Sequence, residues 1–223
     1  MATVIIPASD AGHGYTTTGL PSRKIAIWAF IGSECMLFAS LISTYLIYKG
    51  RSLTGPFPHE VWKDPATGHV FKPILNIPVT SVSTFVLLMS SLAMVLALAA
   101  VENRDIPKHT FGERVLGNSR LWLFVTALLG STFLSFQAYE FTSFVHEGLT
   151  IRTNLFGSSF FTLTGFHGAH VTAGVLWLLT LLGIDFKRGL GPADALNVDI
   201  AALYWHFVDV VWIAIFTLVY LIK

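Results

Sequence analysis

Long uncharged stretches dominate the pattern of hydrophobic and polar positions along this 223-residue chain. A helix needs about 20 mostly apolar residues to cross the hydrocarbon core of a membrane. Five stretches reach this length and together hold only three acidic residues and no basic one: 25–48, 79–101, 121–145, 156–184 and 200–222. None of them has the charged face that is typical of a helix on the surface of a soluble protein. The pattern therefore predicts an all-α membrane protein, a bundle of five transmembrane helices.

Polar and helix-breaking residues separate these stretches and define the domain organisation. Residues 1–24 form a polar N-terminal tail that lacks the basic-then-apolar order of a cleavable signal peptide. Residues 25–223 form a single membrane domain without an internal repeat. The connection over 49–77 is the longest and is rich in proline and glycine, which favour turns and extended backbone. We expect a second surface turn over 185–199, which places Asp185 outside the membrane.

Composition supports the membrane assignment and excludes several other classes of protein. Charged residues make up 12% of the chain, about half their share in a soluble domain, and the mean hydropathy is +0.65. The net charge of +1 and the absence of a basic run exclude a nucleic-acid-binding protein. A single cysteine, Cys35, excludes a disulfide scaffold and a thiolate metal cluster. Lysine and arginine have about equal density in the two sets of loops, so the positive-inside rule gives no orientation.

Glu34 is the only charged residue in the first stretch. It follows Ile31, Gly32 and Ser33, roughly three turns into the predicted helix. An acid at membrane depth faces protein, lipid headgroups or water, and burial favours its neutral form unless a donor or a cation is close. Two interpretations remain open: a proton-linked or lipid-contacting carboxyl, and a protonated acid that forms a hydrogen bond between helices.

Three other stretches each carry two polar side chains three residues apart, which places each pair on one helix face. The pairs are Gln137 with Glu140, His167 with His170, and His206 with Asp209. Small residues surround the second pair and would let another helix approach closely: Gly165, Gly168, Ala169, Ala173 and Gly174. In the third pair the aspartate could hold the imidazole in one tautomer.

These acids and histidines could be assembled into a metal site, or they could form hydrogen bonds between helices. Neither a His-x-x-His nor a His-x-x-Asp pair is specific for a metal, so we expect helix-packing or lipid-contacting polar groups and no metal. A glycine-rich phosphate loop, a nucleophile elbow and a haem-attachment motif are all missing, so no catalytic residue is expected. Several of the six tryptophans lie near predicted span ends, where anchoring at the membrane interface is the ordinary explanation.

The same polar pairs lie in segments that resemble subunit III of the haem-copper oxidases, in its short five-helix bacterial form. The strongest match is YWHFVDVVW at 204–212, followed by FGSSFF at 156–161 with TGFHGAHV at 164–171. QAYE at 137–140 and Ser33-Glu34 match two further family positions in the expected order and spacing. The resemblance runs from about residue 25 to the C-terminus and covers all five spans.

The resemblance implies a non-catalytic accessory subunit III of a proton-pumping cytochrome c oxidase in aerobic respiration. Such a subunit stabilises subunit I by direct contact, assembles with subunit II, binds phospholipid and supports proton uptake. It carries no cofactor itself, because haem and copper belong to the partner subunits, and cytochrome c is the substrate of the holoenzyme. The expected location is the bacterial cytoplasmic (inner) membrane, with the N-terminus in the cytoplasm and the C-terminus outside. Glu34 matches the buried glutamate of the family's first helix.

Two alternatives keep the family but change the complex: subunit III of a quinol oxidase, or an accessory subunit of a nitric oxide reductase. Related quinol oxidases resemble this chain less at two places, with aspartate at the position of Glu34 and Phe-Leu-Asp at 207–209, so the sequence favours a cytochrome c oxidase. A third alternative is a proton-coupled transporter that uses the buried acids as a relay. Transporters generally show repeats and broken helices, which are not visible in this sequence.

Overall fold

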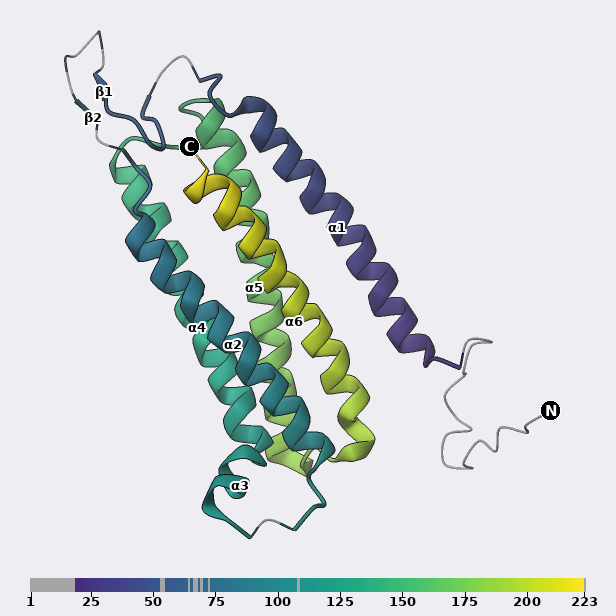
Figure 1. Cartoon of the computed structure of the whole chain (residues 1–223). Helices are drawn as coiled ribbons and strands as arrows, with labels where there is room; N and C mark the ends of the chain where they lie inside the picture. Colours follow the sequence, from purple (N-terminus) through teal and green to yellow (C-terminus); the bar gives the residue numbers. More distant parts are fainter. Residues whose placement is uncertain are drawn as a thin grey trace.

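Five long helices, each antiparallel to the next along the chain, form the bundle in the computed structural model (Figure 1). The structure describes residues 19–222 except 53, 54, 64, 66, 67, 69, 72 and 108. The long helices are α1 (Ser22–Tyr48), α2 (Ile77–Glu102), α4 (Ser119–His146), α5 (Leu155–Arg188) and α6 (Ala195–Phe216). With the turns on either side of α6 counted in, all five are long and apolar enough to cross a membrane. The expected all-α membrane bundle is confirmed.

The helices extend past the apolar stretches that predict them. α1 begins at Ser22, inside the expected tail, whereas tail residues 1–18 lie outside the described part of the chain. α6 begins at Ala195 and ends in a π-helical turn over Thr217–Leu221. α5 continues to Arg188, so Asp185 is helical and fully buried. The expectation of a surface turn at this residue is therefore wrong, because Arg104 and Arg120 form ion pairs with the carboxylate inside the structure.

Short elements fill the connections. The first loop contains β1 (Trp62–Lys63) and β2 (Val70–Phe71), which pair antiparallel with Trp62 opposite Phe71. The helix α3 (Phe111–Leu116) lies between α2 and α4 at the opposite end of the bundle (Figure 1). A 3-10 turn over Pro192–Asp194 leads into α6. The connections therefore hold little regular structure, and the bundle itself positions the polar groups.

Three of the five long helices begin at an asparagine. The Oδ1 atoms of Asn76, Asn118 and Asn154 accept hydrogen bonds from backbone N–H groups three residues later, over 3.4, 3.3 and 2.7 Å. An asparagine in this position satisfies one of the free N–H groups of a helix start. Pro78 in the first turn of α2 removes another N–H group that would have no partner. The sequence thus sets where α2, α4 and α5 enter the apolar layer.

Trp205 of α6 lies at the centre of the bundle. A Cβ atom added to Gly130 of α4 or Gly174 of α5 would come within 2.5 and 2.8 Å of its indole ring. Its Nε1–H donates to Ser90 of α2 over 3.0 Å. Trp212, about two turns further along α6, donates in the same way to Thr84. These two indoles are core residues, so interface anchoring does not explain them.

α1 lies at the edge of the bundle, where it packs against α5 and α6 (Figure 1). Only 11% of the 18 residues in its most apolar segment are buried inside the structure, against 56% of the corresponding residues in the last span. Lys24 forms an ion pair with Asp199 at 2.7 Å near one end of α1, and the Nζ of Lys49 donates to the carbonyl of Ile222 near the other end. A third contact, at Glu34, lies between these two.

Candidate functional site

Glu34 of α1 contacts His170 of α5. The Oε2 of Glu34 lies 3.1 Å from the Nε2 of His170, and both side chains are 17% exposed. The Nδ1 of His170 lies 2.8 Å from the carbonyl oxygen of Phe166, which can only accept, so Nδ1 carries a proton. Nε2 then either accepts a proton from a neutral Glu34 or donates one to the carboxylate. The ring of Phe38 packs edge-on against the imidazole at a centroid distance of 5.1 Å, which limits access of water to the pair.

His206 and Asp209 of α6 both form a hydrogen bond with the hydroxyl group of Ser91 on α2. The Ser91 hydroxyl donates to Oδ2 of Asp209 over 2.7 Å, and the Nδ1 of His206 lies 3.2 Å from the same hydroxyl oxygen. Since the only hydroxyl proton points to the carboxyl group, Nδ1 of His206 donates. Asp209 thus fixes the tautomer of His206 through Ser91 and not by direct contact. The second carboxyl oxygen of Asp209 is buried and has no hydrogen-bond partner in the described part of the chain.

His167 and Gln137 join α5 to its two neighbours. His167 is fully buried, and its Nε2 donates to the carbonyl of Val208 over 3.2 Å. The Gln137 amide donates to the carbonyl of Thr164 over 2.8 Å. Gly168 makes room for this amide, because a Cβ atom there would lie 2.9 Å from its oxygen. Both side chains therefore use backbone carbonyls of a neighbouring span.

Glu140 shares a face of α4 with Gln137 but contacts a different helix. Its Oε1 accepts a short hydrogen bond from the hydroxyl of Thr80 on α2, and the residue is 5% exposed. Tyr220, in the π-helical turn after α6, lies close enough to interact with both Thr80 and Glu140. The three polar pairs predicted from spacing are thus distributed over separate helix contacts.

The structure gives no basis for a metal centre in these residues. Within the described ranges, no group of three or more histidine, cysteine, aspartate and glutamate side chains is arranged to hold a metal ion. Each histidine of the predicted pairs instead has its own hydrogen-bond partner. The arrangement can join helices and hold protons.

Sequence reasoning missed a buried ionic cluster around Asp185. Its Oδ1 lies 3.1 Å from Arg104 on the chain after α2 and 3.7 Å from Arg120 of α4. Its Oδ2 accepts from Ser119 over 2.6 Å, and its Oδ1 also accepts the backbone N–H of Leu190. Arg104 follows the end of α2, and Arg120 lies near the start of α4. These two positions could have indicated the cluster, because a carboxylate one turn before the end of a third span can reach both arginines.

Comparison with known proteins gives one family. The sequence model of the family described as cytochrome c oxidase subunit III matches residues 7–223. A protein of Bacillus sp. (strain PS3) named cytochrome c oxidase subunit 3 is 41% identical over 90% of this chain and 86% of its own length. Its namesake in Bacillus subtilis (strain 168) is 39% identical, again over 90% of this chain and 86% of the relative. A quinol oxidase subunit 3 from that strain is 36% identical over 88% and 85%.

Proposed function

We propose that this chain, which belongs to the cytochrome c oxidase subunit III family, is the non-catalytic accessory subunit of a proton-pumping cytochrome c oxidase. Family membership makes it a subunit III of a haem-copper oxidase complex in a bacterial membrane. The observation that carries the choice of electron donor is the pair of Bacillus relatives named cytochrome c oxidase subunit 3, at 41% and 39% identity. In this proposal haem and copper lie in subunits I and II, and cytochrome c is oxidised by the assembled enzyme.

The polar contacts between the spans support a structural and proton-linked role. Each acid or imidazole of a predicted pair joins two helices, as His170 joins α5 to α1 through its contact with Glu34. A pair that holds one proton near the edge of the bundle is suited to support proton uptake by a neighbouring subunit. We propose that this chain packs directly against subunit I, binds phospholipid, and has its N-terminus in the cytoplasm and its C-terminus outside.

A quinol oxidase is the second candidate, because a quinol oxidase subunit 3 is 36% identical over most of both chains. The two candidates differ in the donor and not in the fold of this subunit. An accessory subunit of a nitric oxide reductase and a proton-coupled transporter are further alternatives.

Purification of the intact complex through a tag on this chain tests the proposal. We expect subunits I and II to co-purify with a-type haem bands and the complex to oxidise reduced cytochrome c. Quinol oxidation without cytochrome c oxidation would favour the second candidate. Haem or copper bound in stoichiometric amounts to this chain alone would overturn the non-catalytic role, and ion flux through the reconstituted chain without partners would favour a transporter.

A further inference from the structure

A polar side chain of α6 is open to the surface near the middle of the membrane. His206 is half-buried and lies 11 residues after Ala195, the first residue of α6, about 16 Å along the helix axis. This depth is near the centre of a hydrocarbon layer about 30 Å thick. Since Nδ1 of His206 donates its proton to Ser91, Nε2 of the neutral imidazole can only accept. No described residue donates to this Nε2, and the atom is not buried.

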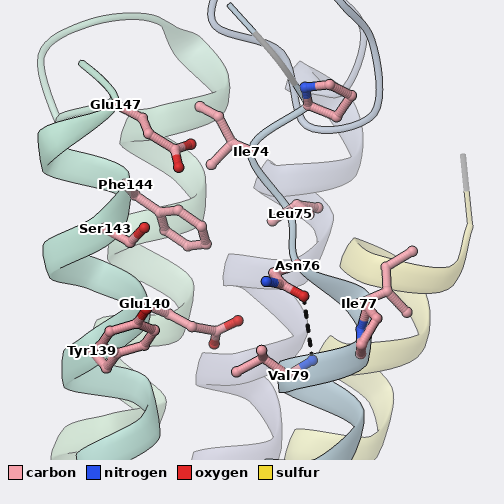
Figure 2. Close-up of a pocket in the computed structure, with 12 residues that line it drawn as sticks. Ile74, Leu75, Asn76, Ile77, Val79, Tyr139, Glu140, Ser143, Phe144 and Glu147 are labelled. Atoms are coloured by element: carbon pink, nitrogen blue, oxygen red, sulfur yellow. Dashed lines mark hydrogen bonds between the residues drawn. The ribbon is translucent and has the colours of Figure 1, made fainter.

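Other polar groups of the spans are used inside the chain or closed off from outside. Glu34 contacts a residue of α5, and Glu140 accepts a hydrogen bond from a residue of α2. Figure 2 shows Glu140 pointing from α4 toward the start of α2. His167 has a ring nitrogen without a described partner, but that nitrogen is buried. Of these groups, only His206 offers an acceptor that a neighbouring molecule can reach.

Apolar side chains surround this acceptor on the side of α6 that lies between α2 and α1 (Figure 1). On α2 they lie three residues before and four residues after Ser91, and on α6 they follow His206 by one and two turns, so they share its side of the helix. The four apolar residues are between 37% and 62% exposed. We call this surface the α2–α6 face, and its residues are Leu88, Ser91, Val95, His206, Val210 and Ile213.

The hydrogen bonds of the polar residues at this face all run in one direction. The Nδ1–H of His206 donates to Ser91, and the hydroxyl of Ser91 donates to Asp209. Both protons are therefore used inside the chain, so the face offers an acceptor and no free donor. A donor from outside would extend this series at Nε2, because hydrogen bonds that point the same way strengthen one another.

The occupant of the face therefore has to bring a hydrogen-bond donor to the middle of the membrane. We propose that a transmembrane helix of subunit I packs on the α2–α6 face and that a hydroxyl or amide group of this helix donates to Nε2 of His206. Polar side chains of membrane helices form such hydrogen bonds across helix contacts. This inference rests on the proposed function, because it assigns a surface to the direct contact with subunit I.

Two other occupants supply no such donor. The acyl chains of lipids carry no polar hydrogen, and the headgroups lie about 15 Å away at either side of the hydrocarbon layer. A second copy of this chain, related by a twofold axis, would bring the same face, because such an interface uses one patch twice. The protons of His206 and Ser91 at that patch are already used within each copy.

Site-specific cross-linking in native membranes tests where subunit I lies. A photo-reactive benzophenone amino acid replaces Val210, at the centre of the face, in the full tagged chain within its complex. The matched control carries the same group in place of Leu176 on α5, where the exposed fraction is 60% against 62% for Val210. After irradiation and purification, we expect position 210 to be joined to a transmembrane peptide of subunit I and position 176 to be joined to lipid alone.

Two substitutions of His206 test the hydrogen bond itself. An asparagine amide reaches only as far as Nδ1 and can still bond Ser91, whereas a glutamine amide reaches the position of Nε2. His206→Asn should therefore weaken the attachment of this chain to subunit I about three- to tenfold, and His206→Gln should weaken it less. Dissociation of this chain from the purified complex on dilution in detergent gives the measurement. A role in holding α2 to α6 alone would give the opposite order.

A second pair of variants tests the face without touching any hydrogen bond of the chain. Val210→Trp adds bulk at an exposed position and should weaken attachment to subunit I, whereas Leu176→Trp should leave it unchanged.

Four results would each overturn the inference while subunit I still co-purifies. They are cross-links from position 210 to lipid alone, cross-links from it to a second copy of this chain, equal or reversed effects of the two His206 variants, and full attachment of Val210→Trp. Absence of subunit I from the purified complex would instead contradict the proposed function, and the inference would fall with it.

Discussion

His170 and Glu34 hold one proton between them across the contact of α5 with α1. The second imidazole nitrogen donates to the carbonyl of Phe166, so the 3.1 Å contact contains a single proton whether the pair is neutral or ionic. The net charge of the pair is zero in both forms. Such a pair is tolerated at membrane depth better than either group alone, because an isolated charge there has no counter-ion.

The first prediction concerns the chemistry of this contact. Glu34→Gln should preserve it, because the amide can donate to Nε2 of His170. Glu34→Ala leaves the imidazole without its partner and should lower the stability of the complex by about 1 to 3 kcal/mol. Thermal unfolding of the purified complex, followed by the release of this subunit, measures the difference. Equal losses for the two variants would show that the hydrogen bond does not hold α1.

The second prediction concerns Asp185, whose carboxylate joins α5 to α4 and to the chain after α2. Asp185→Ala leaves Arg104, Arg120 and Ser119 without this partner and should cost about 3 kcal/mol. Asp185→Asn should cost less, since its carbonyl oxygen can still accept a hydrogen bond. Unfolding of the full chain in detergent measures both.

Asp199 supplies a matched control for Asp185. It pairs with Lys24 near the surface, where both side chains are partly exposed. Asp199→Ala should therefore cost less than about 1 kcal/mol. If the two aspartates proved equally costly to remove, burial would not be the reason for the strength of the Asp185 cluster.

The third prediction separates two glycines of α5. Gly174→Ala should destabilise the bundle by about 1 to 3 kcal/mol, because the added methyl group would meet the Trp205 indole at 2.8 Å. Gly165→Ala meets no atom within 4 Å and should be neutral or stabilising by up to about 1 kcal/mol, the gain in helix propensity. Melting temperatures of the two variants provide the measurement. A destabilised Gly165→Ala chain would point to a partner at this face.

The fourth prediction concerns the pH dependence of α3. Hydrogen bonds from the backbone N–H groups of Thr110 and His109 lower the pKa of Glu113 below its ordinary value. A lowered pKa in the folded state means that the carboxylate stabilises α3 above the ordinary glutamate pKa. This stabilisation is lost as the pH falls through the lowered value.

Amide hydrogen exchange over 111–116 in Glu113→Gln and in the unchanged chain tests this. The exchange rates of the two chains should differ at neutral pH and become alike in acid, when the glutamate is protonated. A difference that persists unchanged into acid would contradict the role of the charge.

Hydrophobic pattern alone predicted the five helices, because a membrane demands a minimum apolar length and no tertiary contact is needed to recognise it. The same pattern identified Glu34 as an isolated acid, and spacing identified Gln137 and Glu140 as polar groups on one face of an apolar helix. Which helices pack together is not encoded in spacing. The partner of Glu34 is 136 residues away in the sequence.

The third polar pair shows the same limit. His206 and Asp209 do share a face, yet the hydroxyl of Ser91 joins them, and nothing about a serine in an apolar stretch distinguishes it from its neighbours. Asp185 was misplaced for the opposite reason. A carboxylate beside two basic residues looks like part of a surface turn until Arg104, after α2, and Arg120, in α4, are known to reach it.

The position of α1 has a consequence for biosynthesis. α1 is translated before α5 and α6, the two helices against which it packs. Glu34 therefore enters the bilayer well before His170 has been translated, and α1 waits there without its partners. The order of translation favours a neutral acid at insertion, and α1 gains its packing partners only after α5 and α6 have been made.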